Sequence, residues 1–496
     1  MKRQVAFTWL CLASFSLVLA CDQVAKRADD KSDSPVSPGG NPTVGQGQSD
    51  PNQAGISAQI FDEAPLTNAS ISNLPQLVSA LNLSRYHDQG YHCQNLRIAV
   101  LDNGFFGVKQ SMGRYLPPTV QLFDAPGNRA QDTAHGTKLA EILYALCTGK
   151  NTYDASIPGP QLLLLNTNGF TNFVKAIDQV IALKADIVLY SQVWEYGGNA
   201  TGGGGFVNRE VNRALQQGIL WINAAGNFGN TTYHAKTEFD ETDSHVLLPY
   251  MNRYVRMEVT QDKTPVKVVL AWNDFAESKD YKTPQNLDLV LEDANHKEIG
   301  AGRLVQDGRD HSRDPDADRY SAHAREIVKV LLNRGTYYLR VDAKSRNFDH
   351  LSKFRIMADG EGVKFVDRTT DETVLMPADN PGVLTIGAVD VDYSASGIYK
   401  DGTVRKPELG TVSSISFADG NTFKGTSSAA AIAAGAIAVY SGHYGKLSKS
   451  IVDSLIENGT LAAESEQGSN SISVVCTGNN CSENTSGATP PVLRLP

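Results

Sequence analysis

The sequence predicts an α/β fold in which an inserted β-sandwich interrupts a mainly parallel central sheet. Residues 96–235 alternate short apolar runs with helical periodicity, the pattern of strand–helix–strand units. Residues 236–362 change to period-two alternation with turn residues between the runs, which indicates antiparallel strands. A buried strand at 383–389 and an Ala-rich helix at 427–442 return to the first pattern. We therefore expect the α/β domain to be discontinuous.

The first region contains four apolar runs that we expect to be strands, at 96–101, 161–165, 187–190 and 219–222. The segments between them, such as 139–146, carry apolar residues at the spacing of one helix face. Ligand sites in open parallel sheets lie at the carboxyl ends of the strands. Functional side chains are therefore expected just after these runs.

The patterns also predict how the chain is divided. In the inserted region the alternating runs lie at 254–259, 266–272, 287–291 and 336–341, with no long helix between them. Beyond residue 57 we predict three parts. A discontinuous α/β domain comprises residues 58–235 and 363–465, and the inserted domain comprises residues 236–362. A C-terminal extension comprises residues 466–496.

The composition is that of an ordinary globular protein. Of the 496 residues, 41% are hydrophobic and 20% are charged, and the formal net charge is -9. Phosphate binding needs clustered Lys and Arg, and no basic run longer than a few residues occurs. We therefore expect no nucleic-acid partner.

The N-terminus predicts export. Lys2 and Arg3 precede an apolar run from 5 to 20 that is too short for a comfortable membrane span and fits a signal peptide, residues 1–20. The run ends in Val-Leu-Ala-Cys, which resembles the bacterial lipoprotein box, with Cys21 as the lipidated residue. The alternative is an ordinary signal peptide with a chance cysteine. We expect a lipid-anchored protein of the bacterial cell envelope that faces outside the cytoplasm, with residues 21–57 as a flexible tether.

Four further cysteines follow Cys21, namely Cys93, Cys147, Cys476 and Cys481. An even number outside the cytoplasm indicates disulfides. Three pairings are possible, and the pairing of Cys93 with Cys147 and of Cys476 with Cys481 closes the smaller loops. A metal site is the weaker alternative, because no CxxC pair or nearby His spacing supports it.

Four polar residues match what serine-based acyl transfer requires: a hydroxyl, a base, a carboxylate that orients the base, and donors for the oxyanion. Asp102 directly follows the first strand. His135 begins the next helix, whose positive end favours the neutral imidazole that a general base needs. Ser427 begins the Ala-rich helix, and Asn227 follows the fourth strand. We expect Asp102, His135 and Ser427 to form a catalytic triad and Asn227 to be an oxyanion donor.

Each of these residues also has an ordinary structural interpretation. Asp102 and Asn227 suit turns, His135 suits an exposed surface position, and Ser427 suits the N-cap of a buried helix. Two observations together favour the catalytic interpretation. The four residues occur in the order Asp, His, Asn and Ser, and each of them stands at a strand end or a helix start.

This constellation resembles that of the subtilisin-like serine proteases in four blocks, at 99–104, 135–137, 225–227 and 425–427. Subtilisin has the same order of Asp, His and Ser. The resemblance implies a three-layer fold and the hydrolysis of polypeptides through an acyl-enzyme.

The resemblance further implies that Ser191, Gln192 and Val193 bind substrate at the end of a backbone-binding strand. The chain departs from the family at these positions, because Gln192 and Val193 replace a small Gly-containing segment. Lys138 stands where a second His is common, and residues 430–432 replace a Thr-Pro-His run. These departures leave the substrate preference open.

The inserted region resembles the jelly-roll domains that accompany some members of this family. Asp314, Asp316 and Asp318 suggest calcium, but arginines interleave them, which favours a solvated loop. The acyl-transfer chemistry itself needs no metal or other cofactor.

The function expected from these observations is an extracytoplasmic serine endopeptidase whose partners are a polypeptide substrate and the membrane. The alternative is a catalytically silent lipoprotein that uses the sandwich for surface binding. An esterase of the α/β-hydrolase type would need a GxSxG motif and the order Ser, Asp, His, and both are absent.

Overall fold

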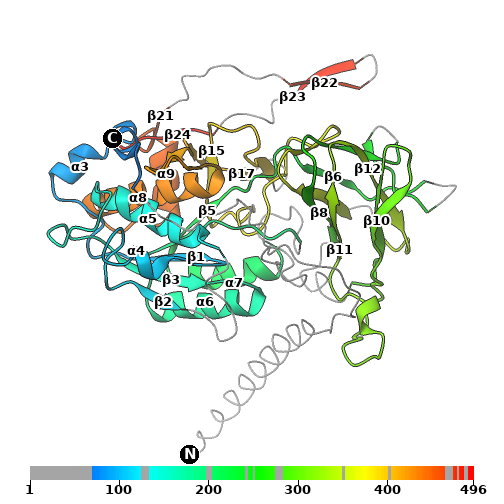
Figure 1. Cartoon of the computed structure of the whole chain (residues 1–496), viewed down its shortest axis with the longest axis horizontal. Helices are drawn as coiled ribbons and strands as arrows, with labels where there is room; N and C mark the ends of the chain where they lie inside the picture. The colour runs from blue at the N-terminus through cyan, green and yellow to red at the C-terminus, as the bar shows by residue number, and fades with distance from the viewer. Residues whose placement is uncertain are drawn as a thin grey trace, which may run out of the picture.

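The computed structural model has an α/β body and a body of antiparallel strands, which lie side by side (Figure 1). The predicted signal peptide, Cys21 and the tether at 21–57 lie outside the described residues. The structure describes residues 70–123, 133–196, 204–240, 244–249, 252–273, 283–348, 352–399, 404–463, 473–477, 480–484 and 490–496.

The α/β body is built on a nine-stranded sheet in which neighbouring strands are parallel except for one edge pair, β24 with β21. Its central strands are apolar on both faces; in β1 only Arg97 is exposed. The spatial order is β2 (Gln121–Phe123), β3 (Gln161–Asn166), β1 (Arg97–Asp102), β4 (Ile187–Tyr190), β5 (Leu220–Ala224), β15 (Leu384–Ala388), β18 (Leu409–Thr411), β24 (Val492–Leu493) and β21 (Ala462–Ala463). The predicted α/β class with a mainly parallel sheet is confirmed.

Helices cover both faces of this sheet, which gives three layers (Figure 1). Alternate residues of β1 enter two cores, because successive side chains of a strand point to opposite faces. Ile98 and Val100 pack in the core that contains α5 and α8, whereas Ala99 and Leu101 pack in the core of α6 and α7. The helices are α2 (Leu74–Ala80), α3 (Ser84–Asp88), α4 (Val108–Ser111), α5 (His135–Thr148), α6 (Phe170–Ala182), α7 (Phe206–Leu215), α8 (Thr426–Tyr444) and α9 (Lys449–Glu457).

Helix α8 is buried nearly throughout, and its small residues allow this. A Cβ atom at Gly435 would lie 2.8 Å from the Cβ atom of Leu146 on α5. Glycine therefore permits α5 and α8 to pack at a separation that a larger residue would prevent. The two helices that begin at His135 and Thr426 are thereby held against each other.

The antiparallel body contains two facing sheets around a second core, which includes Trp272 and Leu289. One sheet has the order β10 (Glu298–Gly302), β9 (Leu287–Glu292), β12 (Gly335–Ala343), β7 (Val255–Val259) and β14 (Val363–Phe365). The other has the order β11 (Arg325–Leu332), β8 (Thr264–Asn273), β13 (Lys353–Asp359) and β6 (Thr232–Lys236). These strands run from residue 232 to residue 365, a range slightly wider than 236–362.

Strand β8 connects the two bodies, because both of its faces are buried. Its even-numbered residues, such as Val268 and Leu270, enter the core between the two antiparallel sheets. On the opposite face, Ala271 and Val269 pack into apolar clusters that also contain residues of the α/β body. Lys267 on that same face forms an ion pair with the buried Glu195, which follows β4.

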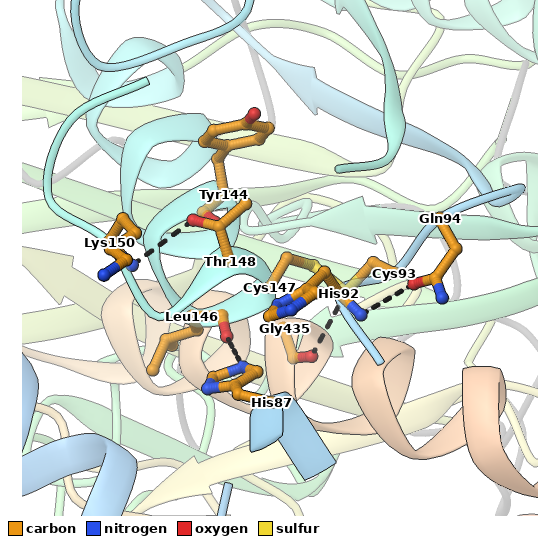
Figure 2. Close-up of a disulfide and its surroundings, with 10 residues drawn as sticks. All are labelled: His87, His92, Cys93, Gln94, Tyr144, Leu146, Cys147, Thr148, Lys150 and Gly435. Carbon is orange, nitrogen blue, oxygen red and sulfur yellow. Dashed lines mark hydrogen bonds between the residues drawn. A yellow bond between two sulfur atoms is a disulfide. The ribbon is translucent and has the colours of Figure 1, made fainter. Parts of the chain in front are cut away.

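A disulfide joins the segment that precedes β1 to helix α5 in the α/β body. Cys93, just before β1, is bonded to Cys147 on α5, as one of the predicted pairings has it. The Cys93 sulfur also lies 3.9 Å from the carbonyl oxygen of Gly435 on α8. Figure 2 shows this junction, with His87 bonded to the Leu146 carbonyl oxygen beside it.

Three two-stranded ribbons complete the described elements, namely β16 (Gly397–Tyr399) with β17 (Val404–Lys406), β19 (Ile415–Ser416) with β20 (Thr422–Phe423), and β22 (Ser473–Thr477) with β23 (Asn480–Asn484). The register of the last ribbon pairs Cys476 with Cys481. Their disulfide stays a prediction, because the side chains lie outside the described part. In the described ranges, no helix has the length and apolar character needed to cross a bilayer.

Candidate active site

Asp102 is the last residue of β1, at the carboxyl edge of the parallel sheet. Its side chain is fully buried. The backbone N–H of Gly104 donates to Oδ1 at 3.4 Å, and the other oxygen, Oδ2, lies 2.7 Å from His135 Nδ1. Burial raises the pKa of the neighbouring Tyr190 far above its ordinary value, so this phenol stays neutral. Asp102 is thus a buried carboxylate directed at an imidazole.

His135 is the first residue of α5 and is almost completely buried. The helix can begin this close to Asp102 because the next residue is Gly136. A Cβ atom there would lie 2.7 Å from the Asp102 Cβ atom and 2.6 Å from the ring of Phe105. A side chain at Gly136 would therefore push α5 away and separate the imidazole from the carboxylate.

The carboxylate determines which imidazole nitrogen can act as a base. A carboxylate only accepts hydrogen bonds, so Nδ1 of His135 carries the proton that Asp102 Oδ2 accepts. In the neutral ring, Nε2 then has the free electron pair. The positive end of α5 opposes a charge on the ring and Asp102 favours it, so the two effects act in opposite directions.

Ser427 is the second residue of α8. Its hydroxyl donates to the backbone carbonyl oxygen of Ser191 at 3.2 Å, and the Ser191 hydroxyl donates to the Ser427 carbonyl oxygen at 3.5 Å. The N–H groups of a first helical turn have no acceptor within the helix. The adjacent Ser428 differs completely, because it is fully buried and donates to the carbonyl oxygens of Ser413 and Gly425.

The Asn227 side chain has a defined orientation. Its Oδ1 atom accepts hydrogen bonds from both the backbone N–H and the hydroxyl of Thr426, each at 3.1 Å. The Thr426 hydroxyl in turn accepts from the backbone N–H of Gly226. Gly425 has a φ of 128°, and a Cβ atom there would lie 3.2 Å from Asn227 Oδ1, so a side chain would be strained and crowded. The oxygen is held by Thr426, which leaves the NH₂ group as the donating end.

A small cavity of about 20 Å³ lies at the carboxyl edge of the sheet and brings most of these residues together. Its lining comes from four separate chain segments and comprises His135, Ser191, Val193, Gly226, Asn227, Phe228, Phe423, Lys424, Thr426 and Ser427. Asp102 lies behind His135. Gln192 does not line the cavity: its Oε1 atom accepts from the Thr167 hydroxyl, as expected for a residue that alternates with Ser191 and Val193.

Phe423 is a site residue that the sequence analysis missed. Its ring packs edge-on against the His135 ring, with centroids 5.5 Å apart, and the Lys138 ammonium lies 5.6 Å from the same ring. Thr426 and Phe228 were missed as well. Proximity was the available signal for these two, since Thr426 precedes Ser427 and Phe228 follows Asn227. No comparable signal marked Phe423.

The three candidate calcium ligands lie in an exposed loop far along the chain from this cavity. Asp314 lies 2.6 Å from His311 Nδ1, and Asp316 lies 3.6 Å from Arg319. Within the residues that the structure describes, no group of three or more His, Cys, Asp or Glu side chains is placed to hold a metal ion. The calcium alternative stays a prediction.

Comparison with known proteins finds similar folds among solved structures. No protein-family model and no curated protein matches the sequence. The chain is similar to the CspB protease of Clostridium perfringens (12% identity, 86% of this chain and 96% of that chain, TM-score 0.46). It is also similar to a cold-adapted subtilisin-like serine proteinase (13%, 82% and 90%, 0.36). A third similar structure is the epidermin leader peptide processing serine protease of Staphylococcus aureus (13%, 84% and 80%, 0.36). At these values the function has to be inferred from the site itself.

Proposed function

We propose that this protein is a serine endopeptidase that hydrolyses peptide bonds through an acyl-enzyme. The observation that carries the proposal is the contact of 2.7 Å between His135 Nδ1 and the buried Asp102, in a site whose cavity is lined by both His135 and Ser427. A base oriented by a carboxylate, a hydroxyl at a helix start and an amide donor are the parts that acyl transfer requires.

In the acylation step, the Ser427 oxygen attacks the peptide carbonyl carbon, and its proton moves to Nε2 of His135. In the free protein this hydroxyl donates to Ser191, so rotation about the Cα–Cβ bond must redirect it toward the imidazole. Asp102 keeps the proton on Nδ1 and stabilises the imidazolium. The imidazolium then protonates the leaving amine, and the acyl group remains on Ser427.

The negative charge that develops on the carbonyl oxygen needs donors. Asn227 contributes its NH₂ group, which is oriented because Thr426 holds the amide oxygen. The backbone N–H of Ser427, in the first turn of α8, is the second donor. In deacylation, His135 takes a proton from a water molecule, the resulting hydroxide attacks the ester, and Ser427 recovers its proton.

A kinetic comparison of single and double variants tests this function. Ser427→Ala and His135→Ala should each reduce hydrolysis of a mixed peptide library to near background, and the double variant should be little worse. The residues act as one unit, so their losses do not add. Hydrolysis by Ser427→Ala at the wild-type rate would overturn the proposal.

We further propose that the enzyme acts in the bacterial cell envelope, attached through lipid on Cys21 and spaced from the membrane by residues 21–57. The basic start, the short apolar run and the cysteine at its end support this. More than one acyl chain on a single residue is enough for stable anchoring. Cys21→Ser should release the protein from the membrane fraction, and continued sedimentation with membranes would contradict the proposal.

A further inference from the structure

The cavity beside Ser427 is narrow. Besides His135, Asn227 and Ser427, its lining includes the bulky side chains of Val193 and Phe228. These side chains decide how much of a substrate residue can enter beside the attacked carbonyl.

The geometry of acyl transfer requires the substrate side chain to begin in this space. The carbonyl carbon must come within about 3–3.5 Å of the Ser427 oxygen. The residue that owns this carbonyl has its Cβ atom only about 2.5 Å further on, two bonds away. With the carbonyl oxygen at the Asn227 amide, that Cβ atom comes close to the part of the cavity wall that adjoins Asn227, at Gly226 and Phe228.

This wall is built from Val193 and Phe228, which converge on Gly226. A Cβ atom at Gly226 would lie 3.3 Å from Phe228 Cδ2 and 3.4 Å from Val193 Cγ2. Both side chains are buried. The space that a longer substrate side chain would need is therefore already occupied by this chain's own residues.

The antiparallel body supports the same wall from behind. Val193 and Phe228 share one apolar cluster with Val269 of β8 and Met357 of β13. A close-packed cluster yields little, because displacing its members creates overlaps or cavities elsewhere. Moving Val193 or Phe228 aside when a substrate binds would therefore cost free energy.

We infer that Val193 and Phe228 restrict cleavage to peptide bonds whose carbonyl belongs to glycine or alanine. This inference rests on the proposed peptidase function and adds the substrate class to it. The selectivity comes from exclusion: a side chain longer than a methyl group has no room beside the carbonyl that Ser427 attacks.

Four quenched peptides that differ only in the residue donating the scissile carbonyl, Gly, Ala, Leu or Phe, test the inference with the full-length protein. A pocket discriminates by about 10- to 200-fold for one methylene group, so kcat/KM for Ala should exceed that for Leu and Phe at least tenfold. Equal or faster cleavage at Leu or Phe would overturn the inference and leave the peptidase proposal standing. If none of the four is cleaved, the peptidase proposal itself is overturned.

Two enlargements of the pocket sharpen the test. Phe228→Leu and Val193→Ala should each raise the ratio of kcat/KM for Leu over Ala at least tenfold. Phe365→Leu is the matched control for Phe228→Leu, because it makes the same substitution in the core between the antiparallel sheets. It should leave this ratio unchanged. A change of the same size in Phe365→Leu, or no change in both enlarged variants, would contradict the role of the two wall residues.

Discussion

The parallel sheet and the antiparallel sheets each contribute apolar residues to a buried core, but they place their polar groups differently. In the α/β body, Asp102 ends a strand, His135 begins a helix, and both meet at one edge of the sheet. In the antiparallel body, polar residues such as Lys267 lie along the strand faces and are paired with partners across a contact. The comparison teaches that substitutions at the sheet edge should lower turnover, whereas substitutions along the strand faces should lower stability.

The two regions meet at the segment after β4. At this contact, residues expected to affect turnover lie next to residues expected to affect stability. Val193 contributes to the cavity, and two residues later Glu195 binds Lys267 of β8. Arg325 of β11 lies over the ring of Tyr196, 4.1 Å from its centroid. A stabilising contact thus lies within a few residues of the wall that limits the substrate.

The largest expected effect is the loss of turnover in Asp102→Asn. The asparagine amide can donate a hydrogen bond to Nδ1 of His135, so the imidazole proton would move to Nε2. Nε2 could then no longer accept the Ser427 proton, and kcat should fall about 10,000-fold. The melting temperature should change little, because asparagine has nearly the same shape. Asp154→Asn, at an exposed turn, should keep wild-type kcat. A large fall in stability with kcat retained would break the proposed division of roles.

Asn227→Ala should have the next largest effect. The amide contributes mainly once charge develops on the carbonyl oxygen, so kcat should fall about 100- to 1,000-fold with KM nearly unchanged. Steady-state kinetics, corrected for the fraction of folded protein, measure this. Unchanged kcat with lowered stability would show that Asn227 is a turn residue.

Much of the α/β architecture and the placement of Asp102 and His135 could be predicted, because strand ends and helix starts are local signals. The apolar residues of β8 could also be recognised in the sequence. The sequence did not show that they pack against the α/β body. Val269 and Ala271 are apolar on the face that an ordinary two-sheet sandwich exposes, and the partners that cover them are distant in the sequence. Phe423 could not be found for a related reason, since an aromatic residue packing on an imidazole has no sequence signature of its own.

Lys267→Met tests the strand-face side of the comparison. It leaves the Glu195 carboxylate buried without its cation, so the free energy of unfolding should fall by roughly 3 kcal/mol, the lower end for a buried pair because Lys267 keeps 19% exposure. Chemical denaturation measures this. Arg213→Met removes an exposed cation from the α/β body and should cost under about 1 kcal/mol. Equal losses in the two variants would contradict the prediction.

The remaining prediction concerns the pH dependence of stability, an effect that is small at any single pH step and accumulates over several pH units. Burial raises the pKa of Glu326 on β11 to about 8, so the folded protein keeps this carboxyl protonated while the unfolded chain ionises above its ordinary pKa. Stability should therefore fall as the pH rises from about 5 to 8, by up to about 1.4 kcal/mol per pH unit. Burial raises the pKa of Glu141 on α5 to about 7, which adds to the same decline.

Glu326→Gln should flatten this decline and leave the part that comes from Glu141. Denaturation midpoints between pH 5 and 8 measure the slope. Glu298→Gln is the control, because Arg303 lowers the pKa of this exposed carboxyl, which stays ionised throughout that range. An unchanged slope in Glu326→Gln would show that the buried carboxyl does not remain protonated.

The central claim is that Ser427, and no neighbouring hydroxyl, is the nucleophile activated by His135. Labelling with a fluorophosphonate followed by peptide mapping tests it directly, because the reagent reacts with an activated serine. Wild type and Ser428→Ala should both be labelled, with the phosphonate of the wild type on Ser427, since Ser428 is buried and bonded to backbone carbonyl oxygens. Ser427→Ala should not be labelled. Labelling that persists in Ser427→Ala, or that disappears only in Ser428→Ala, would contradict the account.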